Sequence, residues 1–430
     1  MNFDDALRDL NGRQPESQPE PTLDRIREVA DLLDNPQFAY PTIHVTGTNG
    51  KTTTTRMVTA VACAHGLSTG TFISPHVAAI TERLSVCGVD ITKEEFAEEY
   101  ERLAPYFERA EGFGRQITYF EALTAMAYLW FADKPVALGA FEVGMGGTWD
   151  ATNLIGGDVA VLCPIGLDHP ELGSTVEEVA TEKAGIIKEG KIAVSRDQRP
   201  EALSVIERRC KQTQAILLLE GADFGLDSRV PAVGGQSIAV RGVHRSYEDI
   251  YLPAFGDHMA RNAAAAVVAC ESLLGRALDE GSVRGAFRRV TTPARLEVVG
   301  RRPLVLLDGA HNPDAGAALV RTLTEEFTWN RLLLVIAMFE DKDVETFVRL
   351  LAPLVDRAYA SVNSSPRSAS AERVVAVLRA SGADDVERHS TVGDAVEAAV
   401  AAAQHDDLIL VTGSFYTVAD ARPLFVGGSE

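Results

Sequence analysis

The sequence lacks any apolar run of the length needed to cross a bilayer, and its polar start, Met1 to Asp5, does not have the pattern of a signal peptide. It is also poor in cysteine, with five residues, an odd number, and no C-x-x-C spacing among them. We therefore expect no membrane partner, no zinc site and no disulfide framework. A reducing, cytoplasmic location fits this composition best. The cysteines are Cys63, Cys87, Cys163, Cys210 and Cys270.

Positive charge is scarce as well. The formal net charge is −20, and proteins that bind DNA or RNA usually carry basic surface, so we expect no nucleic-acid partner. An anionic substrate must then be held by a local cluster of positive groups. Lysine is much rarer than arginine, which makes the positions of the lysines informative: Lys51, Lys93, Lys134, Lys183, Lys188, Lys191, Lys211 and Lys342.

One local motif stands out against these absences. The apolar run Ile43–Val45 leads into Thr46-Gly47-Thr48-Asn49-Gly50-Lys51-Thr52-Thr53, and a helix-compatible segment follows. Such a loop binds phosphate, because backbone N–H groups and the helix N-terminus face the anion, the lysine adds charge and the threonine hydroxyl can hold Mg²⁺. Val45 replaces the first glycine of the usual P-loop pattern. The motif predicts binding of a nucleotide triphosphate.

The length and the segment pattern predict two domains. A chain of 430 residues exceeds what one core usually supports. Strand-like and helix-like segments alternate, which predicts an α/β fold: a mainly parallel sheet in a P-loop domain over residues 1–290, then a smaller Rossmann-like domain over 291–430. We predict strands at 43–45, 68–73, 136–143, 159–165, 191–195, 304–307, 332–337, 357–361 and 408–411; helices at 23–33, 54–65, 93–108, 119–132, 176–188, 258–274, 315–326, 344–354, 371–381 and 392–404; a loop at 11–22; and a small β subregion at 215–252.

Acidic residues and histidines follow several predicted strands. Glu142 ends a strand beside the P-loop strand, a place where a carboxylate usually holds the nucleotide's Mg²⁺. The glycines at 144, 146 and 147 do not complete a dinucleotide-binding pattern. Asp168 and His169 follow the next strand, as ligands or as an ordinary turn. Glu182 and Lys183 lie near a helix end, where such a pair is often only solvated charge.

The second domain opens with a similar group. Asp308 and His311 follow its first predicted strand, and Arg295 precedes it. An arginine, an aspartate and a histidine at one sheet edge suggest that this domain also contacts the nucleotide. A turn with an ion pair is the alternative.

Together these motifs resemble one family, the folylpolyglutamate synthase/dihydrofolate synthase branch of the Mur ligase superfamily. The resemblance runs in order from Ile43 to about Tyr416. Thr148-Trp149 depart from the family's Arg followed by Leu or Tyr, which loses a positive charge near the expected metal site, and Met259 replaces a Gln. The segments that carry the resemblance are Ile73–Val77 with Glu82–Leu84 (S-P-H-L…E-R-I), Thr118–Glu121 (T-x-F-E), Glu142–Asn153 (E-V-G-L-G-G-R-x-D-A-T-N), Ile165–Lys188 (I-G-L-D-H…L-G-x-T…E-K-A-G-I-I-K), Gly256–Ala264 (G-x-H-Q-x-x-N-A-A), Pro293–Glu297, Asp308–Pro313, Asp341–Asp343 and Gly413–Tyr416.

The resemblance implies an ATP-dependent carboxylate–amine ligase. The carboxylate of dihydropteroate or of a folate attacks the γ-phosphate of ATP, and the amine of L-glutamate then displaces phosphate from the acyl phosphate. Lys51 and two Mg²⁺ ions neutralise the charge on the transferred phosphoryl group, with Lys183 as a carbamate nearby. Closure of the second domain excludes water. We expect a monomer whose partners are these small molecules.

The resemblance also assigns roles to individual residues. The catalytic residues are Lys51, Lys183 and His169; the nucleotide-binding residues are Thr48, Asn49, Gly50, Lys51, Thr52, Thr53, Asn262, Arg295, Asp308 and His311; the metal ligands are Thr52, Ser74, Glu142 and His169; and the substrate-binding residues are Pro75, His76, Arg83, Phe120 and Asp150.

Three other functions remain as alternatives. A sister ligase would add amino acids to a UDP-N-acetylmuramoyl peptide, although Ser74-Pro75-His76 follows the folate branch. A P-loop switch would hydrolyse ATP without making a bond. A dehydrogenase would need the dinucleotide-binding pattern that the glycines after Glu142 fail to complete.

Overall fold

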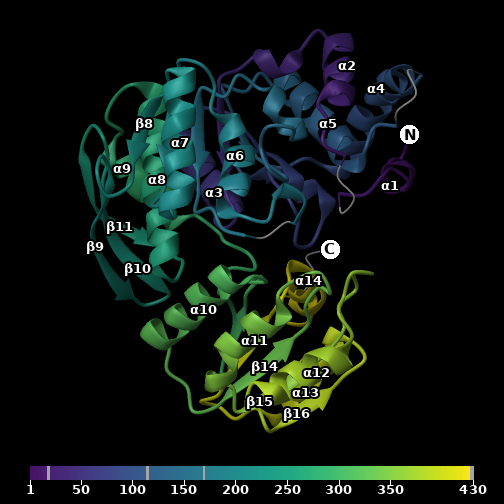
Figure 1. Ribbon diagram of the computed structural model, residues 1–430, viewed down its shortest axis with the longest axis vertical. Coiled ribbons are helices and arrows are strands. Elements are labelled where there is room, and N and C mark those ends of the chain that lie inside the picture. The colour runs from purple at the N-terminus through teal and green to yellow at the C-terminus, as the bar shows by residue number, and fades with distance from the viewer. Residues whose placement is uncertain (17–19, 113–115, 168–169, 427–430) are drawn as a thin grey trace. The chain divides into compact units, whose positions relative to one another are not determined.

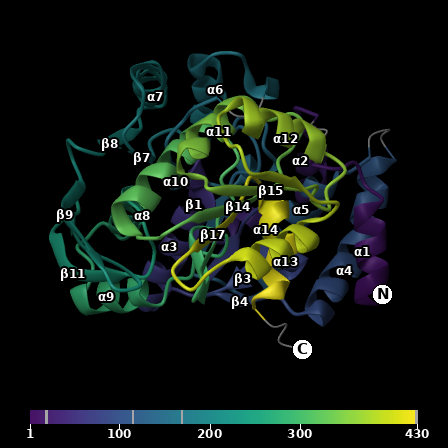
Figure 2. The same ribbon diagram turned by 90° about the horizontal axis from the view of Figure 1, so that it is seen from below.

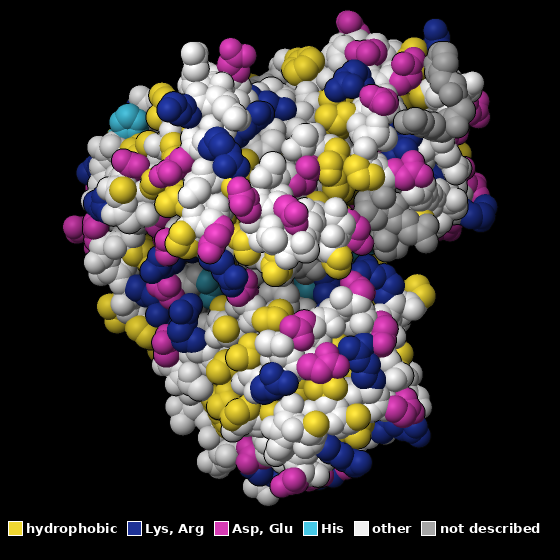
Figure 3. Space-filling view, viewed as in Figure 1, with side chains coloured by type: hydrophobic (Ala, Val, Ile, Leu, Met, Phe, Trp, Pro, Cys, Tyr) yellow, Lys and Arg dark blue, Asp and Glu magenta, His cyan; other side chains and the backbone are white. Residues whose placement is uncertain are grey.

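The computed structural model describes residues 1–16, 20–112, 116–167 and 170–426 (Figure 1). The chain forms two compact units. On the face of the molecule drawn in Figure 3, acidic and basic side chains are interspersed over both. No helix among the described residues is long and apolar enough to span a membrane. The first unit consists of Met1–Val230, Ser237–Leu252 and Met259–Val290, and the second of Pro231–Gln236, Pro253–His258 and Thr291–Glu430.

An eight-stranded sheet in the order β4-β3-β2-β5-β1-β6-β7-β8 forms the centre of the first unit. Strands β2, β5, β1, β6, β7 and β8 run parallel to one another, and β3 and β4 add an antiparallel edge beside β2. The chain leaves β1 toward β2 but later crosses from β5 to β6 in the opposite direction, so the strand order reverses at β1. Open α/β sheets bind ligands at such a point. The strands are β1 (Thr42–Thr46), β2 (Thr69–Phe72), β3 (Leu84–Val86), β4 (Val89–Asp90), β5 (Leu138–Glu142), β6 (Val159–Leu162), β7 (Ile192–Ser195) and β8 (Ile216–Leu219).

Helices cover both faces of this sheet. Right-handed crossovers place α3 on one face and α5, α6 and α7 on the other. On its face α3 packs against α9, and Cys270 of α8 contacts the carbonyl of Val58 in α3; on the opposite face α6 and α7 lie side by side (Figure 1). The helices are α1 (Phe3–Asn11), α2 (Asp24–Leu32), α3 (Lys51–Ala64), α4 (Lys93–Glu111), α5 (Tyr119–Asp133), α6 (Val176–Lys183), α7 (Pro200–Thr213), α8 (Asp257–Leu274) and α9 (Glu280–Arg288).

Local sequence explains where α5 begins and what it covers. The Thr118 hydroxyl accepts a hydrogen bond from the N–H of Glu121 at 3.2 Å, and the Glu121 carboxylate accepts one from the N–H of Thr118 at 2.9 Å, which is a capping box. Beneath this helix the ring of Phe141 on β5 lies 6.4 Å from that of Tyr40 and 6.1 Å from that of Phe72, centroid to centroid. This aromatic core fixes β5 and β2, whose ends carry candidate site residues.

A small three-stranded sheet in the order β11-β10-β9 lies beside α9 (Figure 1). Glu271 of α8 is fully buried and accepts hydrogen bonds from the hydroxyl of Tyr247 and the N–H of Val243, both at 2.7 Å. A carboxylate thus joins the turn between β10 and β11 to α8. The strands are β9 (Gly225–Ala232), β10 (Gly235–Arg241) and β11 (Ser246–Leu252).

The second unit contains a six-stranded sheet in the order β12-β13-β17-β14-β15-β16. All neighbouring strands are parallel except the antiparallel edge pair β12 and β13. Figure 2 shows α10, α11 and α12 along one face of this sheet, with α13 and α14 on the other. The elements are β12 (Glu297–Arg301), β13 (Leu304–Leu307), α10 (Pro313–Glu326), β14 (Leu332–Ile336), α11 (Val344–Leu351), β15 (Arg357–Ala360), α12 (Ala371–Ala380), β16 (Val386–Arg388), α13 (Val392–Ala402), β17 (Leu408–Thr412) and α14 (Phe415–Ala421).

The predicted α/β class and the mainly parallel sheet are confirmed. Helix α3 begins at Lys51 rather than at the predicted Thr54, so the helix N-terminus lies at the loop lysine itself. Helix α6 ends at Lys183 and continues as a 3-10 turn, Ala184–Ile186. The prediction of one small β subregion at 215–252 is wrong in part, because β8 joins the parallel sheet. Helix α7, with 14 residues, was not predicted, and neither were the shorter elements α1, α9, α14, β3, β4, β12 and β16.

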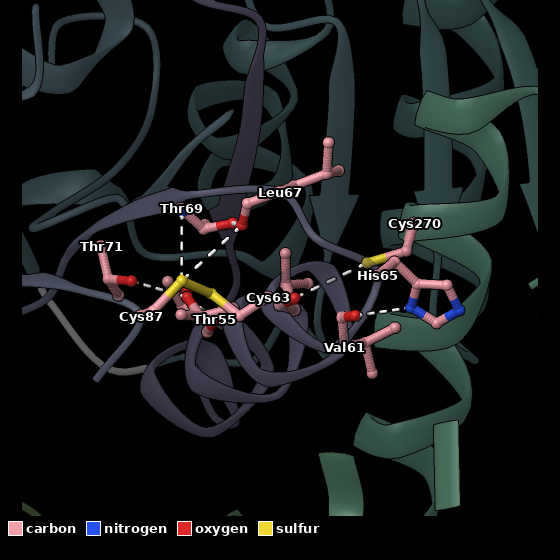
Figure 4. The surroundings of a disulfide bond; sticks show 11 residues. Thr55, Val61, Cys63, His65, Leu67, Thr69, Thr71, Cys87 and Cys270 are labelled. Atoms are coloured by element: carbon pink, nitrogen blue, oxygen red, sulfur yellow. Dashed lines mark hydrogen bonds between the residues drawn. A yellow bond between two sulfur atoms is a disulfide. The ribbon is translucent and has the colours of Figure 1, made fainter. Parts of the chain in front are cut away.

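The expectation of no disulfide framework is wrong in part, because Cys63 and Cys87 are bonded at an S–S distance of 2.02 Å (Figure 4). Cys63 lies in the last turn of α3, and Cys87 lies in the turn between β3 and β4. Pairing of β3 with β2 brings the two positions together across 24 residues of sequence. Sequence spacing alone does not reveal that approach. The other three cysteines are buried and free.

Candidate functional site

Polar groups follow the carboxyl ends of adjacent parallel strands in the first unit. Because these ends meet at one edge of the sheet, residues far apart in the sequence are gathered there. In spatial order they are Ser74 after β2, Glu142 at the end of β5, Gly47–Gly50 after β1, Pro164–Gly166 after β6, Arg196 after β7 and Glu220 after β8.

The loop after β1 requires glycine at two positions. Gly47 has a φ of +141° and Gly50 a φ of +94°, a region that residues with a Cβ rarely adopt. A Cβ on Gly47 would also lie 2.6 Å from that of Cys163. The Thr48 hydroxyl donates a hydrogen bond to the carbonyl of Gly166 at 2.9 Å, which ties the loop to the segment after β6. These contacts fix the backbone of the loop against the segment after β6.

Lys51 is the first residue of α3, and its ammonium lies over the loop. It donates to the carbonyls of Gly47 at 3.1 Å and Thr48 at 3.4 Å. A positive charge is thus positioned where backbone N–H groups and a helix N-terminus also favour an anion. The remaining predicted loop residues are placed with it: Asn49 and Thr52 are half-buried, and Thr53 is buried inside α3.

Glu142 and Thr52 form the candidate metal site. Glu142 is 1% exposed, and its carboxylate accepts a hydrogen bond from the Thr52 hydroxyl at 2.9 Å and from the N–H of Ser74 at 3.2 Å. Oxygen donors of this kind suit Mg²⁺, which keeps several waters and substrate phosphates as its other ligands. No group of three or more Asp, Glu, His or Cys side chains among the described residues is arranged to hold a metal ion. The predicted ligand His169, like Asp168, lies outside the described residues.

Lys183 lies beneath the phosphate loop. Its side chain is buried, and its ammonium donates a hydrogen bond to the carbonyl of Gly47 at 3.0 Å. The glycine-rich segment after β5 allows this approach, since a Cβ on Gly147 would lie 2.8 Å from the carbonyl oxygen of Lys183. Close packing of the two segments explains how α6, far along the chain, delivers a lysine to the loop after β1.

The predicted substrate segment follows β2. Pro75 follows Ser74 through a cis peptide bond, and the Nδ1 atom of His76 accepts a hydrogen bond from Nε of Arg83 at 3.0 Å. Arg83 is 3% exposed and also pairs with the carboxylate of Glu16. Burial, with the Arg83 charge second, lowers the pKa of His76 to about 4. His76 is therefore a neutral acceptor at neutral pH.

Two further predicted substrate residues have different surroundings. Phe120 packs against the ring of Phe72, and a Cβ on Gly144 would lie 2.5 Å from the Phe120 ring. Asp150 is 3% exposed and accepts hydrogen bonds from the N–H groups of Met145 and Thr152, at 2.9 and 3.0 Å. Burial raises the pKa of Asp150 to about 6. These bonds shape the loop after β5, and a role for Asp150 in binding substrate stays a prediction.

The second unit has its own polar edge. Asp308, at the end of β13, accepts hydrogen bonds from the N–H groups of Leu296 and Ala310, both at 2.9 Å. The guanidinium carbon of Arg295 lies 4.4 Å from the centre of the Phe415 ring. His311 bonds through Nδ1 to the carbonyl of Gly309 at 2.8 Å. All three predicted nucleotide-binding residues of this unit thus lie on neighbouring loops of the same sheet.

Sequence reasoning missed Arg196. This arginine directly follows β7, its side chain is 4% exposed, and it donates a hydrogen bond to the Asn262 side chain. A Cβ on Gly50 would lie 3.0 Å from Oδ1 of that asparagine. Arg196 thereby connects a predicted nucleotide-binding residue to the edge of the sheet. Its place immediately after the predicted strand 191–195 was the available signal.

Comparison with known proteins places this geometry in context. Residues 45–270 match the Mur ligase middle domain, and residues 294–415 match the Mur ligase, glutamate ligase domain. The dihydrofolate synthase/folylpolyglutamate synthase of Mycobacterium tuberculosis is 38% identical over 97% of this chain and 92% of its own length. The enzyme of the same name from Bacillus subtilis is 32% identical over 94% of each chain.

Solved structures agree with these sequence matches. Mycobacterium tuberculosis folylpolyglutamate synthase complexed with ADP has a TM-score of 0.95 and 36% identity, covering 100% of this chain and 99% of that one. Escherichia coli FolC in complex with DHPP and ADP has a TM-score of 0.88 and 31% identity, covering 99% of this chain and 97% of that one.

Proposed function

This chain belongs to the dihydrofolate synthase/folylpolyglutamate synthase family of the Mur ligases, and we propose that it joins L-glutamate to dihydropteroate and to folates. It is an ATP-dependent ligase. The observation that carries the proposal is the grouping of Lys51, Thr52 and Glu142 at the point where the strand order reverses. That grouping suits transfer of a phosphoryl group to a substrate carboxylate.

The proposed reaction has two steps. A carboxylate oxygen of the pteridine substrate attacks the γ-phosphorus of ATP, the bond to the β,γ-bridging oxygen breaks, and ADP leaves. The nitrogen of L-glutamate then attacks the acyl phosphate, loses a proton and expels phosphate as the amide forms. Lys51 and the N–H groups at the start of α3 offset the negative charge on the transferred group. Thr52, Ser74 and Glu142 would hold Mg²⁺, which supplies Lewis-acid stabilisation of the same charge.

Lys183 is proposed to act as a carbamate. Its neutral amine would add to CO₂ and release a proton, which replaces a positive charge by a negative one near the metal. The buried position against the Gly47 carbonyl supports a role at the loop. Lys183→Ala should lower kcat by orders of magnitude, and formate should restore part of it by filling the vacated space. A fully active Lys183→Ala variant would remove the carbamate from the proposal.

Substrate recognition is proposed for the segment after β2 and for Phe120. His76, Arg83 and Phe120 are proposed to contact a planar pteridine substrate; Arg83 is 3% exposed and donates to Nδ1 of the neutral His76 ring, and Phe120 packs on the ring of Phe72. Arg295, Asp308 and His311 are proposed to bind the nucleotide from the second unit. Asp150 is proposed to bind substrate. His169, which lies outside the described residues, is proposed to bind a metal ion and to take part in catalysis.

Phosphate release with different acceptors tests the proposed function. We expect glutamate-dependent phosphate release with dihydropteroate and with a reduced folate, measured in parallel. Release with only one of them would restrict the activity to that substrate. A UDP-N-acetylmuramoyl peptide as the only active acceptor would indicate a cell-wall ligase, and release without any acceptor would indicate a P-loop switch.

Location and assembly are proposed separately. We propose a cytoplasmic monomer whose partners are the small-molecule substrates. Size-exclusion chromatography with light scattering tests the oligomeric state. Thiol titration of protein isolated under alkylating conditions tests the compartment, because a reducing cytoplasm would open the Cys63–Cys87 bond, whereas an oxidising compartment would retain it.

A further inference from the structure

Arg196 is a buried cation at the edge of the sheet that carries the phosphate loop. It directly follows β7, and its side chain is 4% exposed. Burying a guanidinium without partners is costly, so its surroundings reveal which contacts hold it. Nε donates to the carboxylate of Glu220 at 2.8 Å, and Nη1 donates to Oδ1 of Asn262.

Glu220 fixes the orientation of the guanidinium. It directly follows β8, its side chain is 3% exposed, and the oxygen that accepts from Arg196 also accepts from the N–H of Asp197 at 2.8 Å. Arg261 approaches the other carboxylate oxygen at 3.3 Å. With one side of the planar guanidinium held by this carboxylate, the Nη1 side faces Asn262.

The arginine determines which way the Asn262 amide points. Arginine has only hydrogen-bond donors, so the amide atom that meets it must be the oxygen, and the NH₂ group is turned away from Arg196. Both amide atoms lie against Gly50: a Cβ there would be 3.0 Å from Oδ1 and 3.2 Å from Nδ2. Asn262 is 2% exposed and has little freedom to turn over. A donor group is thereby fixed beside the residue that precedes Lys51.

We propose that Arg196 is a positioning residue that fixes the Asn262 amide with its NH₂ group toward the nucleotide, where it donates to a phosphate or nucleoside acceptor. This inference rests on the proposed function, because it takes the loop to be the ATP site. Arg196 itself acts through Asn262. The competing explanation is that Arg196 and Glu220 only tie β7 to β8.

Binding of ADP by single and double variants separates these explanations. Arg196→Met and Asn262→Ala should each weaken ADP binding by about five- to tenfold, as expected for one lost hydrogen bond. The double variant should bind no more weakly than Asn262→Ala, because Arg196 has nothing left to position. Independent effects that multiply, or an Arg196→Met variant that binds ADP as the wild type does, would overturn the proposal.

Two milder substitutions keep the test valid if Arg196→Met does not fold. Asn262→Asp preserves the acceptor for Arg196 but removes the NH₂ group, so it should bind ADP as weakly as Asn262→Ala while staying folded. Arg196→Lys keeps the charge but cannot hold Glu220 and Asn262 together, so it should recover only part of the affinity. Normal ADP binding by Asn262→Asp would show that the NH₂ group has no role.

A matched control comes from the second unit. Arg331 donates to Asp407, which is 1% exposed, at 2.6 Å, and this pair lies at the amino ends of β14 and β17, away from the carboxyl ends that carry the candidate residues. Arg331→Met should lower the melting temperature without changing ADP affinity. Failure of the wild type to release phosphate with any folate substrate would contradict the proposed function. Normal turnover by the wild type, together with unaltered ADP binding by the Arg196 variants, would contradict only the role of Arg196.

Discussion

Lys51 provides the most direct residue-scale test of the loop. Its ammonium donates hydrogen bonds to the carbonyls of Gly47 and Thr48 in its own loop, so Lys51→Ala should change the free energy of unfolding by at most about 1 kcal/mol. We expect kcat to fall at least about a hundredfold, because charge on the transferred phosphoryl group would lose a fixed cation. Lys211→Ala, on the exposed face of α7, is the control for loss of a lysine. A Lys51→Ala variant with a tenth of wild-type kcat would contradict the assigned role.

His76 gives a residue-scale prediction about pH. Its pKa in the folded protein, about 4, lies below the ordinary histidine value because of burial and the Arg83 charge. As the pH falls, His76 therefore binds a proton in the unfolded chain before it does so in the folded protein. The stabilisation that neutral His76 provides is complete above the pKa of the unfolded chain and is lost as the pH falls from that value to the pKa of the folded protein. His76→Asn keeps an acceptor but does not titrate. Relative to that variant, the wild type should lose at most about 2 kcal/mol of unfolding free energy between pH 7 and pH 5, measured by urea denaturation. An identical pH dependence for both proteins would contradict this assignment.

Residues of the candidate site differed in how well the sequence predicted them. Lys51 and Thr52 lie in one short motif, and Glu142 follows a strand whose apolar pattern is clear, so local sequence was sufficient. Arg196 meets Asn262 across 66 positions, and only the packed structure shows that contact. Asp150 was assigned to substrate binding from the family resemblance, yet it accepts hydrogen bonds from backbone N–H groups of its own loop.

At the scale of elements, α3 connects the phosphate loop to the β3–β4 hairpin. The helix begins at Lys51, and Cys63 in its last turn is bonded to Cys87. The hairpin directly follows Arg83, so the disulfide joins the end of the nucleotide helix to the end of the predicted substrate segment. Elements with a strong local pattern, such as α3, were predicted, whereas β3 and β4, with three and two residues, have too little sequence to show a period.

The disulfide should contribute to stability more than to turnover. Linking residues 24 positions apart restricts the unfolded chain, which corresponds to about 3 kcal/mol in the loop-entropy model. Cys63→Ser/Cys87→Ser should therefore melt at a lower temperature than the oxidised wild type and match the reduced wild type. Calorimetry with and without a thiol reductant measures this. An unchanged melting temperature after reduction, with thiol titration confirming that the bond has opened, would contradict the expected stabilisation.

At the scale of the whole molecule, the question is whether the second unit takes part in the reaction. Arg295, Asp308 and His311 gather at one edge of its sheet, although the sequence places Arg295 before the first parallel strand and the others after it. Residues 294–415 match the Mur ligase, glutamate ligase domain. The strand alternation predicted the sheet, but the residues that share its edge follow from the strand order, which the sequence does not display.

His311 tests that contribution. The carbonyl of Gly309 only accepts hydrogen bonds, so the proton of neutral His311 lies on Nδ1, and the ring is fixed beside Phe415 at a centroid distance of 6.3 Å. We expect His311→Ala to lower kcat at least about tenfold while ADP affinity changes by less than about threefold, because we propose that the P-loop unit supplies most of the nucleotide binding and that the contact of His311 with the nucleotide matters most during turnover. His405→Ala, at an exposed position in the same unit, is the matched control. Rapid-quench measurement of phosphate release with saturating ATP and folate, together with ADP binding by calorimetry, gives the two quantities. If kcat were unchanged in His311→Ala, the second unit would not act through this histidine; if ADP affinity fell as much as kcat, its role would be to bind nucleotide rather than to promote turnover.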